Sequence, residues 1–192
     1  LEKNHIRNAV ICSKEMCFAL MGISINDTLL DIIVNDMIQK TVEINNCACS
    51  AIISNPLSDY LKLADTYQKL KEGFHIRMIR KQQWQYIFLD ELQYDRIMLH
   101  ISEDTEVHQF IRCKLGPLVE YDRAHDTQLL ETLEAFIQNH NSRKLAAESL
   151  FLHRNTMVHR INKIEEVLHC SLDDTEIMEQ LEFAIKVKMY AH

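Results

Sequence analysis

Glycine and proline are the scarce residues of this chain, and their scarcity limits the fold class. The 192 residues include only three glycines, at positions 22, 73 and 116, and two prolines, at positions 56 and 117. A sandwich or barrel of many short strands needs these residues at its turns. We therefore expect helices to dominate the fold.

The composition is that of a soluble globular protein. Hydrophobic residues make up 47% of the chain and charged residues 26%, and no apolar run is long enough to span a bilayer. The length suits two small domains better than one large one. Six cysteines stand mostly in apolar stretches, and no signal peptide precedes them. We therefore predict a cytoplasmic protein with reduced thiols and no membrane association.

Two of the cysteines raise the question of a metal or redox site. Cys47 and Cys49 are separated by one residue, so in a strand both would lie on the same face. No CxxC motif and no matching cluster of histidine and cysteine stands elsewhere. We interpret both as buried thiols and expect neither a metal nor a cofactor.

Element types alternate in the N-terminal part. Apolar patterns predict strands within 5–20, 47–53 and 84–89, long helices over 27–41 and 58–81, and shorter helices over 90–99 and 105–115. Such alternation predicts a small α/β domain in which helices cover a sheet. Because the first strand is ragged or falls before residue 1, we expect the chain to be the C-terminal piece of a longer protein.

A glycine-proline pair predicts the domain boundary. Pro117 disfavours helix at Gly116, so we divide the chain into 1–117 and 118–192. Beyond it, apolar residues at helical spacing predict four helices, over 127–139, 142–150, 153–168 and 174–190. The predicted fold class is α+β, with a small α/β domain followed by an all-α domain.

Positive charge is concentrated in one stretch of an acidic chain. Residues 142–164 contain five cationic residues and one acidic residue, a net charge of +4, so the remainder sums to −11 of the total −7. Such a concentration is the electrostatic footprint of a nucleic-acid contact. Arg143 and Lys144 follow a predicted N-cap, Ser142, and Arg154 begins the next helix. Cations are disfavoured at a helix N-terminus unless an anion binds there; the alternative is that they are merely exposed.

The second of these helices has two contrasting faces. Its apolar stripe must face the core and consists of Met157, Ile161, Ile164 and Leu168. The opposite face carries Asn155, His159 and Asn162, flanked by Val158, Thr156 and Lys163. Amides and cations can read base edges or hold phosphates. Residues 151–153 connect the two helices, which is the spacing of a helix-turn-helix.

Four stretches carry a family resemblance. They are YDRAHDTQLLETL at 121–133, NSRKLAAESL at 141–150, HRNTMVHRI at 153–161 and LDD at 172–174. Through them, residues 118–192 resemble the C-terminal helix-turn-helix domain of the PucR/CdaR family of bacterial transcriptional regulators. The family usually has a tyrosine where this chain has His159.

Residues 1–117 resemble the degenerate GGDEF-like domain found upstream in that family. The matching stretches are ADTYQKLKEGFHI at 64–76 and WQYIFLDEL at 84–92. The resemblance also implies a sensory module further upstream, outside this chain, that responds to an unknown small-molecule effector.

The resemblance implies a homodimeric regulator of transcription that binds double-stranded DNA. The helix near 154–166 would enter the major groove. The side chains that would contact the phosphate backbone of the DNA are Arg143, Lys144, Arg160 and Lys163. Because Arg160 lies near the edge of the apolar stripe, we expect it to hold a phosphate or a neighbouring acid. The predicted DNA-binding residues are Ser142, Arg143, Lys144, His153, Arg154, Asn155, Thr156, Val158, His159, Arg160, Asn162 and Lys163.

The sequence also bears on two other functions, nucleotide cyclisation and ligand sensing. An intact GGDEF domain makes a cyclic dinucleotide, but the chain has no two adjacent glycines and no acidic pair after them to hold a metal. We predict no enzymatic activity. The alternative is a non-catalytic ligand-sensing or dimerisation module whose helical domain binds a protein partner. A set of aromatic residues would line a pocket or, as we prefer, form ordinary core: Tyr60, Tyr67, Phe74, Trp84, Tyr86 and Phe88.

Overall fold

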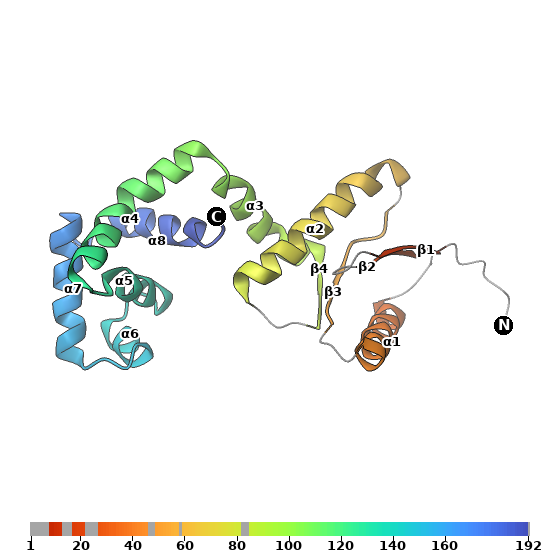
Figure 1. The fold of residues 1–192 in the computed structure, drawn as a ribbon, viewed down its shortest axis with the longest axis horizontal. Coiled ribbons are helices and arrows are strands. Elements are labelled where there is room, and N and C mark those ends of the chain that lie inside the picture. The colour runs from red at the N-terminus through yellow and green to blue at the C-terminus, as the bar shows by residue number, and fades with distance from the viewer. Residues whose placement is uncertain are drawn as a thin grey trace. The chain divides into compact units, whose positions relative to one another are not determined.

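The computed structural model describes residues 8–12, 17–21, 27–45, 49–57, 59–81 and 85–191 (Figure 1). They belong to two compact units, one of Leu1–Ala51 with Trp84–Ile87 and one of Ile52–Gln83 with Phe88–His192. Helices account for most of the described residues, which confirms the expectation from the scarcity of glycine and proline. None of the described helices is both long and apolar enough to cross a membrane.

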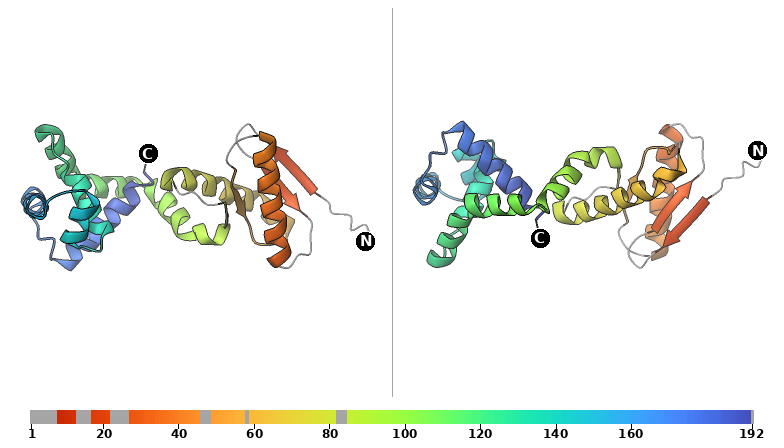
Figure 2. Two further views of the ribbon diagram at one scale, coloured as in Figure 1. Left: turned by 90° about the horizontal axis from the view of Figure 1, so that it is seen from below. Right: turned by 90° about the horizontal axis from the view of Figure 1, so that it is seen from above.

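The first unit begins with a hairpin. Strands β1 (Asn8–Cys12) and β2 (Cys17–Met21) pair antiparallel, with Asn8 opposite Met21 and Cys12 opposite Cys17 (Figure 2). We expected one ragged strand within 5–20, and that prediction is wrong. The polar residues 13–15 divide the apolar run, so the sequence forms two short strands in place of one.

Helix α1 (Asp27–Asn45) follows the hairpin and confirms the helix predicted over 27–41, which it extends by one turn. Val34 and Ile38 are its buried residues among those described. Tyr86 donates its hydroxyl hydrogen to Asp31 of α1 at 2.8 Å. The apolar spacing therefore predicted the helix correctly, but of the residues it marked only Val34 is described as buried, and Met37 is 43% exposed.

The remaining strands are short. β3 (Ala51–Ile53) pairs with β4 (Tyr86–Phe88), and the N–H of Ala51 donates to the carbonyl of Gln85 at 3.0 Å. The described strands thus form two separate two-stranded sheets, where we expected one sheet covered by helices. Cys49 is a half-buried free thiol. Cys47 and Trp84 lie outside the described residues.

Helical elements of the second unit follow each of the strands β3 and β4 along the chain. A 3-10 turn, η1 (Tyr60–Lys62), leads into α2 (Leu63–Arg80), and a second 3-10 turn, η2 (Leu89–Leu92), leads into α3 (Gln93–Ser102). Gly73 of α2 permits a close approach, because a Cβ there would stand 2.7 Å from Cδ1 of Ile52 and 3.0 Å from Cδ1 of Leu92.

Helix α4 (Thr105–His125) runs without a break through Gly116 and Pro117. The prediction that this pair interrupts the helices is wrong. Leu115 and Leu118 on either side are 1% and 0% exposed. A proline inside a helix costs about 3 kcal/mol, while burying one leucine contributes about 1.5 to 3 kcal/mol, so two buried leucines offset the proline. The division of the chain into domains 1–117 and 118–192 stays a prediction.

Four further helices complete the second unit and confirm the four that were predicted. They are α5 (Leu129–Gln138), α6 (Arg143–Ser149), α7 (Arg154–Leu168) and α8 (Thr175–Lys188). Together with α4 they bury a common hydrophobic cluster. Its fully buried members, at 0% exposure, are Leu118, Leu133, Ala146, Met157, Ile161, Ile164 and Ala184.

A buried polar network joins the end of α8 to α3 and α2. Asp95 of α3 is 2% exposed; it accepts a hydrogen bond from Nη1 of Arg80 at 3.0 Å and another from the Tyr190 hydroxyl. The Ser102 hydroxyl lies 3.1 Å from the Tyr190 carbonyl and 2.7 Å from the Leu99 carbonyl. Burial and the Asp95 carboxylate raise the pKa of Tyr190, so this phenol stays a hydrogen-bond donor.

Candidate nucleic-acid interface

The chain makes a tight turn between α6 and α7. Ser142 caps α6 by accepting the N–H of Leu145 at 3.4 Å, which confirms the predicted N-cap. Past the end of α6, Phe151 adopts a left-handed conformation with φ of 55°, and the N–H of Leu152 returns to the Ala147 carbonyl at 2.8 Å. The connection between the helices is residues 150–153, one residue longer than the predicted 151–153, because α6 ends at Ser149.

The residue that caps the N-terminus of α7 is a histidine. His153 has extended backbone angles, and its Nδ1 accepts the N–H of Asn155 at 3.2 Å. An N-cap of this kind satisfies an amide that the helix itself leaves unpaired. His153 was predicted to touch DNA, and its Nδ1 is already engaged in holding the first turn of α7.

The two faces of α7 separate as the sequence predicted. Met157, Ile161 and Ile164 are each 0% exposed and belong to the hydrophobic cluster, while Leu168 packs against it half-buried. The exposed side chains of the helix include Arg154, Asn155, Thr156, His159 and Asn162. A helix that presents amide, hydroxyl, imidazole and guanidinium groups on one exposed face has the donors and acceptors that base edges and phosphates require.

Small residues let α6 and α7 pack closely. Ala146 and Ala147 of α6 are 0% and 5% exposed. Their short side chains bring the backbone of α6 near α7, as the sequence indicated. Arg143 and Lys144 remain exposed at the start of α6.

The N-termini of α6 and α7 differ in charge from those of their neighbours. Helices α2, α3, α4, α5 and α8 all carry an acidic residue in the first turn, whereas α6 and α7 carry none. The first turns of α6 and α7 hold Arg143, Lys144 and Arg154, and no ion pair joins these three to any described residue. Uncompensated cations beside the positive ends of two helix dipoles favour the approach of an anion.

Two of the predicted cations are bonded within the fold. Nη1 of Arg160 donates to Oγ1 of Thr132 at 3.0 Å, and Nη2 lies 3.4 Å from Oε1 of Gln128. Nζ of Lys163 pairs with Glu166 at 2.9 Å and lies 5.2 Å from the centre of the Tyr121 ring. Val158, also predicted, is half-buried. Fewer cationic side chains are therefore available to contact DNA than the count from the sequence suggested.

Asp122, near the end of α4, was not among the predicted site residues. Its carboxylate accepts the N–H groups of Leu129 and Leu130 at 2.8 and 3.0 Å and the Thr127 hydroxyl at 2.6 Å. It thus caps α5 in place of Gln128, whose side chain makes no capping bond. Burial opposes ionisation, but these hydrogen bonds and the charge of Arg160 outweigh it and lower the pKa of Asp122 below its ordinary value of 3.8.

The lowered pKa gives a prediction for stability against pH. A carboxyl that ionises more readily when folded stabilises the protein above the unfolded pKa, and this contribution is lost as pH falls through the folded pKa. We expect Asp122→Asn to lower the free energy of unfolding by about 1 kcal/mol at pH 7, and by less at pH 3.5. Urea denaturation at both pH values measures this. Asp173→Asn, in the exposed loop before α8, is the control; an equal deficit for Asp122→Asn at both pH values would contradict the assignment.

Sequence reasoning also missed an exposed aromatic residue. Phe151 is 97% exposed at the turn between α6 and α7, and Leu145 of α6 is 46% exposed. Nothing in the local pattern distinguished Phe151 from a core residue, because its exposure follows from the left-handed backbone of the turn.

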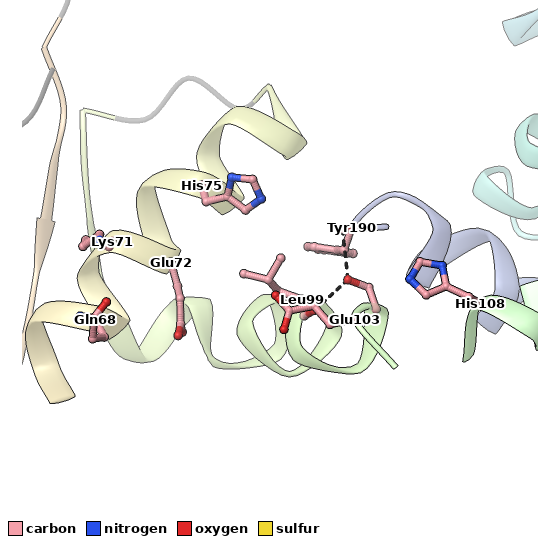
Figure 3. Close-up of a pocket in the computed structure, with 9 residues that line it drawn as sticks. Gln68, Lys71, Glu72, His75, Leu99, Glu103, His108 and Tyr190 are labelled. Atoms are coloured by element: carbon pink, nitrogen blue, oxygen red, sulfur yellow. Dashed lines mark hydrogen bonds between the residues drawn. The ribbon is translucent and has the colours of Figure 1, made fainter. Parts of the chain in front are cut away.

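The second unit also contains an open cavity, lined by parts of α2, α3 and α4 and by Tyr190 (Figure 3). Its volume is about 650 Å³. Lys71, Glu72, His75 and His108 give it a mixed polar lining. None of the described aromatic residues proposed as pocket-lining from the sequence borders it, and the described residues include no group of three or more metal-ligating side chains placed to hold an ion.

The sequence of the helical part of the second unit matches a protein family. Residues 129–187 match the PucR C-terminal helix-turn-helix domain. This segment contains α5, α6 and α7 whole and nearly all of α8, so the turn and the exposed face of α7 lie inside it. The resemblance seen in the sequence is confirmed for this domain, and the likeness of residues 1–117 to a GGDEF-like domain stays a prediction.

Two curated relatives are named as transcriptional activators and a third as a regulatory protein. The chain is 31% identical to the proline-responsive transcriptional activator PutR of Bacillus subtilis (strain 168), over 67% of this chain and 32% of PutR. It is 31% identical to the purine catabolism regulatory protein of the same organism, over 47% of this chain and 17% of that protein. With the DNA-binding transcriptional activator AdeR it shares 30% identity over 38% of this chain and 18% of AdeR. The chain thus spans a third or less of the length of these relatives.

Proposed function

We propose that this chain is a sequence-specific DNA-binding regulator of transcription of the PucR type, without enzymatic activity. The observation that carries the proposal is the exposed face of α7, which sets Arg154, Asn155 and Asn162 outward while Ile161 and Ile164 are fully buried. The match to a helix-turn-helix family and the names of the relatives support it.

In this proposal α7 enters the major groove of double-stranded DNA. Base edges there offer a paired donor and acceptor on adenine, which suit the side-chain amide of Asn155. Thr156, His159 and Asn162 lie along the same exposed face and would extend the contact.

Phosphate contacts would come from the two helix N-termini. Arg143 and Lys144 are exposed in the first turn of α6, and Arg154 is exposed at the start of α7. Phosphates that bind there would meet both the cations and the unpaired N–H groups of the first turns. Such contacts hold the protein in register on the duplex without reading sequence.

We further propose that the regulator acts as a homodimer. Helix-turn-helix proteins commonly read two half-sites about 34 to 36 Å apart, one helical turn of DNA, which needs two copies of the recognition helix. An effector would be sensed by a part of the protein outside this chain.

Salt titration of DNA binding tests the proposal. Fluorescence anisotropy with a 30-base-pair duplex, selected by this chain from a random-sequence library, is expected to show affinity falling steeply with salt, with a slope of roughly −0.9 per neutralised phosphate. Arg154→Ala and Asn155→Ala are expected to weaken binding by about 1 to 3 kcal/mol each, and Asn155→Ala to relax sequence preference as well. Arg112→Ala, on the exposed surface of α4, is the control. Binding that is indifferent to salt and to both substitutions would refute the assignment.

A further inference from the structure

Arg160 lies on α7 but not on its exposed face. Its guanidinium reaches Thr132 and Gln128, both at the start of α5, at 3.0 and 3.4 Å. Thr132 is 0% exposed and gives its own hydroxyl hydrogen to the Gln128 carbonyl at 2.7 Å. The Thr132 oxygen therefore has lone pairs left for Arg160, and a hydroxyl in this state binds a cationic donor well.

An acidic side chain of the chain itself already stands at the helix N-terminus beside Arg160. The N-terminus of α5 is the positive end of a helix dipole, which would repel a guanidinium. Asp122 stands at that terminus, caps Leu129 and Leu130, and is close enough for the charge of Arg160 to lower its pKa. A phosphate that approached Arg160 would meet the Asp122 carboxylate, whereas a phosphate at Arg154 meets no acidic first-turn residue.

Lys163, one turn further along α7, also has partners within the fold. It lies over the ring of Tyr121 and pairs with Glu166. Tyr121 and Asp122 are adjacent residues of α4, so Arg160 and Lys163 form one edge of α7 that is held against the end of α4 and the start of α5. This edge is distinct from the exposed residues Arg154, Asn155 and Asn162.

We infer that Arg160 is a positioning residue: it fixes the orientation of α7 through its hydrogen bonds to Thr132 and Gln128, and it does not bind phosphate. The inference rests on the proposed DNA-binding function and assigns a different role to one residue that the sequence placed among the backbone contacts. The planar guanidinium suits this role, since it reaches two acceptors from one rigid group while the Asp122 charge offsets its own.

A phosphate contact and a positioning residue therefore change different measured quantities. A residue that binds phosphate contributes to the salt slope, so its loss makes log K less dependent on log salt by roughly 0.9. A residue that orients the reading helix contributes to the preference for the selected duplex over a random duplex, and its loss leaves the salt slope unchanged.

The test compares Arg160→Met with Arg154→Met in the full 192-residue chain. Anisotropy is measured with the library-selected duplex and a random duplex over a salt series, at a temperature where circular dichroism shows each variant folded. We expect Arg160→Met to lower the ratio of the two affinities roughly tenfold without changing the salt slope. We expect Arg154→Met to reduce the slope by roughly 0.9.

Two further variants separate orientation from simple loss of stability. Arg160→Lys keeps the charge but cannot reach both acceptors, so it should leave the affinity ratio lowered, whereas a phosphate contact would be largely rescued by lysine. Thr132→Val removes the hydroxyl while keeping the shape of the side chain. If Arg160 acts through Thr132, the effects of the two substitutions overlap. The double variant Thr132→Val with Arg160→Met then lowers the affinity ratio by less than the product of the two single-variant reductions.

The outcomes distinguish this inference from the proposed function. If the unaltered chain binds DNA with no salt dependence, the proposed function fails. If it binds as proposed but Arg160→Met reduces the salt slope and Arg160→Lys restores it, Arg160 is a phosphate contact and the inference is overturned. An unchanged affinity ratio in Arg160→Met overturns it as well.

Discussion

Ile161→Ala is expected to lower the free energy of unfolding by about 3 to 5 kcal/mol, because it removes three carbon atoms from a fully buried side chain and leaves a cavity. Ile161 is 0% exposed on α7 and belongs to the hydrophobic cluster that α4, α5, α6, α7 and α8 share. The cluster surrounds it with other helices, so little relaxation can fill the space. Urea denaturation followed by circular dichroism measures the loss.

The neighbouring residue supplies a matched control for this prediction. Asn162 is exposed, so Asn162→Ala should change the free energy of unfolding by less than about 0.5 kcal/mol while weakening DNA binding. Ile161→Val, which removes one methyl group, should cost about 0.5 to 1.5 kcal/mol. A loss for Ile161→Ala no larger than that for Ile161→Val would mean that α7 is not packed as described.

Arg80→Met is expected to destabilise the second unit by about 2 to 4 kcal/mol, because it leaves the buried Asp95 carboxylate without its cation. The Asp95 side chain is 3% exposed, whereas that of Arg80 is 37% exposed, so solvent screens part of the pair. The expected loss is therefore somewhat below that of a fully buried ion pair. Thermal and urea denaturation measure it.

Neutralising the acid should recover part of this loss. In the double variant Arg80→Met with Asp95→Asn, no charge is left buried, and the amide oxygen that replaces the carboxylate can still accept from Tyr190. We therefore expect the double variant to be more stable than Arg80→Met alone. Arg112→Met, an exposed substitution on α4, controls for the loss of positive charge. A double variant less stable than Arg80→Met would show that the charge of Asp95 is not what destabilises the single variant.

The sequence predicted the helical part of the chain well because its signals are local. The apolar spacing of 153–168 and the N-cap at Ser142 gave α7 and the start of α6 correctly. The exposed and buried faces of α7 followed from the same spacing, since a helix with one apolar stripe can bury only that stripe.

The errors arose where distant residues decide the outcome. Pro117 argued for a break in α4, but the burial of Leu115 and Leu118 depends on helices that the local sequence does not reveal. The hydrogen bonds of Arg160 were missed because its partners Thr132 and Gln128 lie 28 and 32 residues earlier in the chain. The capping of α5 by Asp122 crosses a loop in the same way.

The continuity of α4 bears on how the helix-turn-helix part can be isolated for study. A fragment that began at residue 118 would start inside this helix and would leave Leu115 behind, although Leu115 and Leu118 belong to one hydrophobic cluster. It would also lack Asp95 and Ser102, whose side chains form hydrogen bonds with Tyr190. A fragment intended to fold by itself therefore has to retain α3 and the whole of α4, and to keep Arg80 as well it must begin within or before α2.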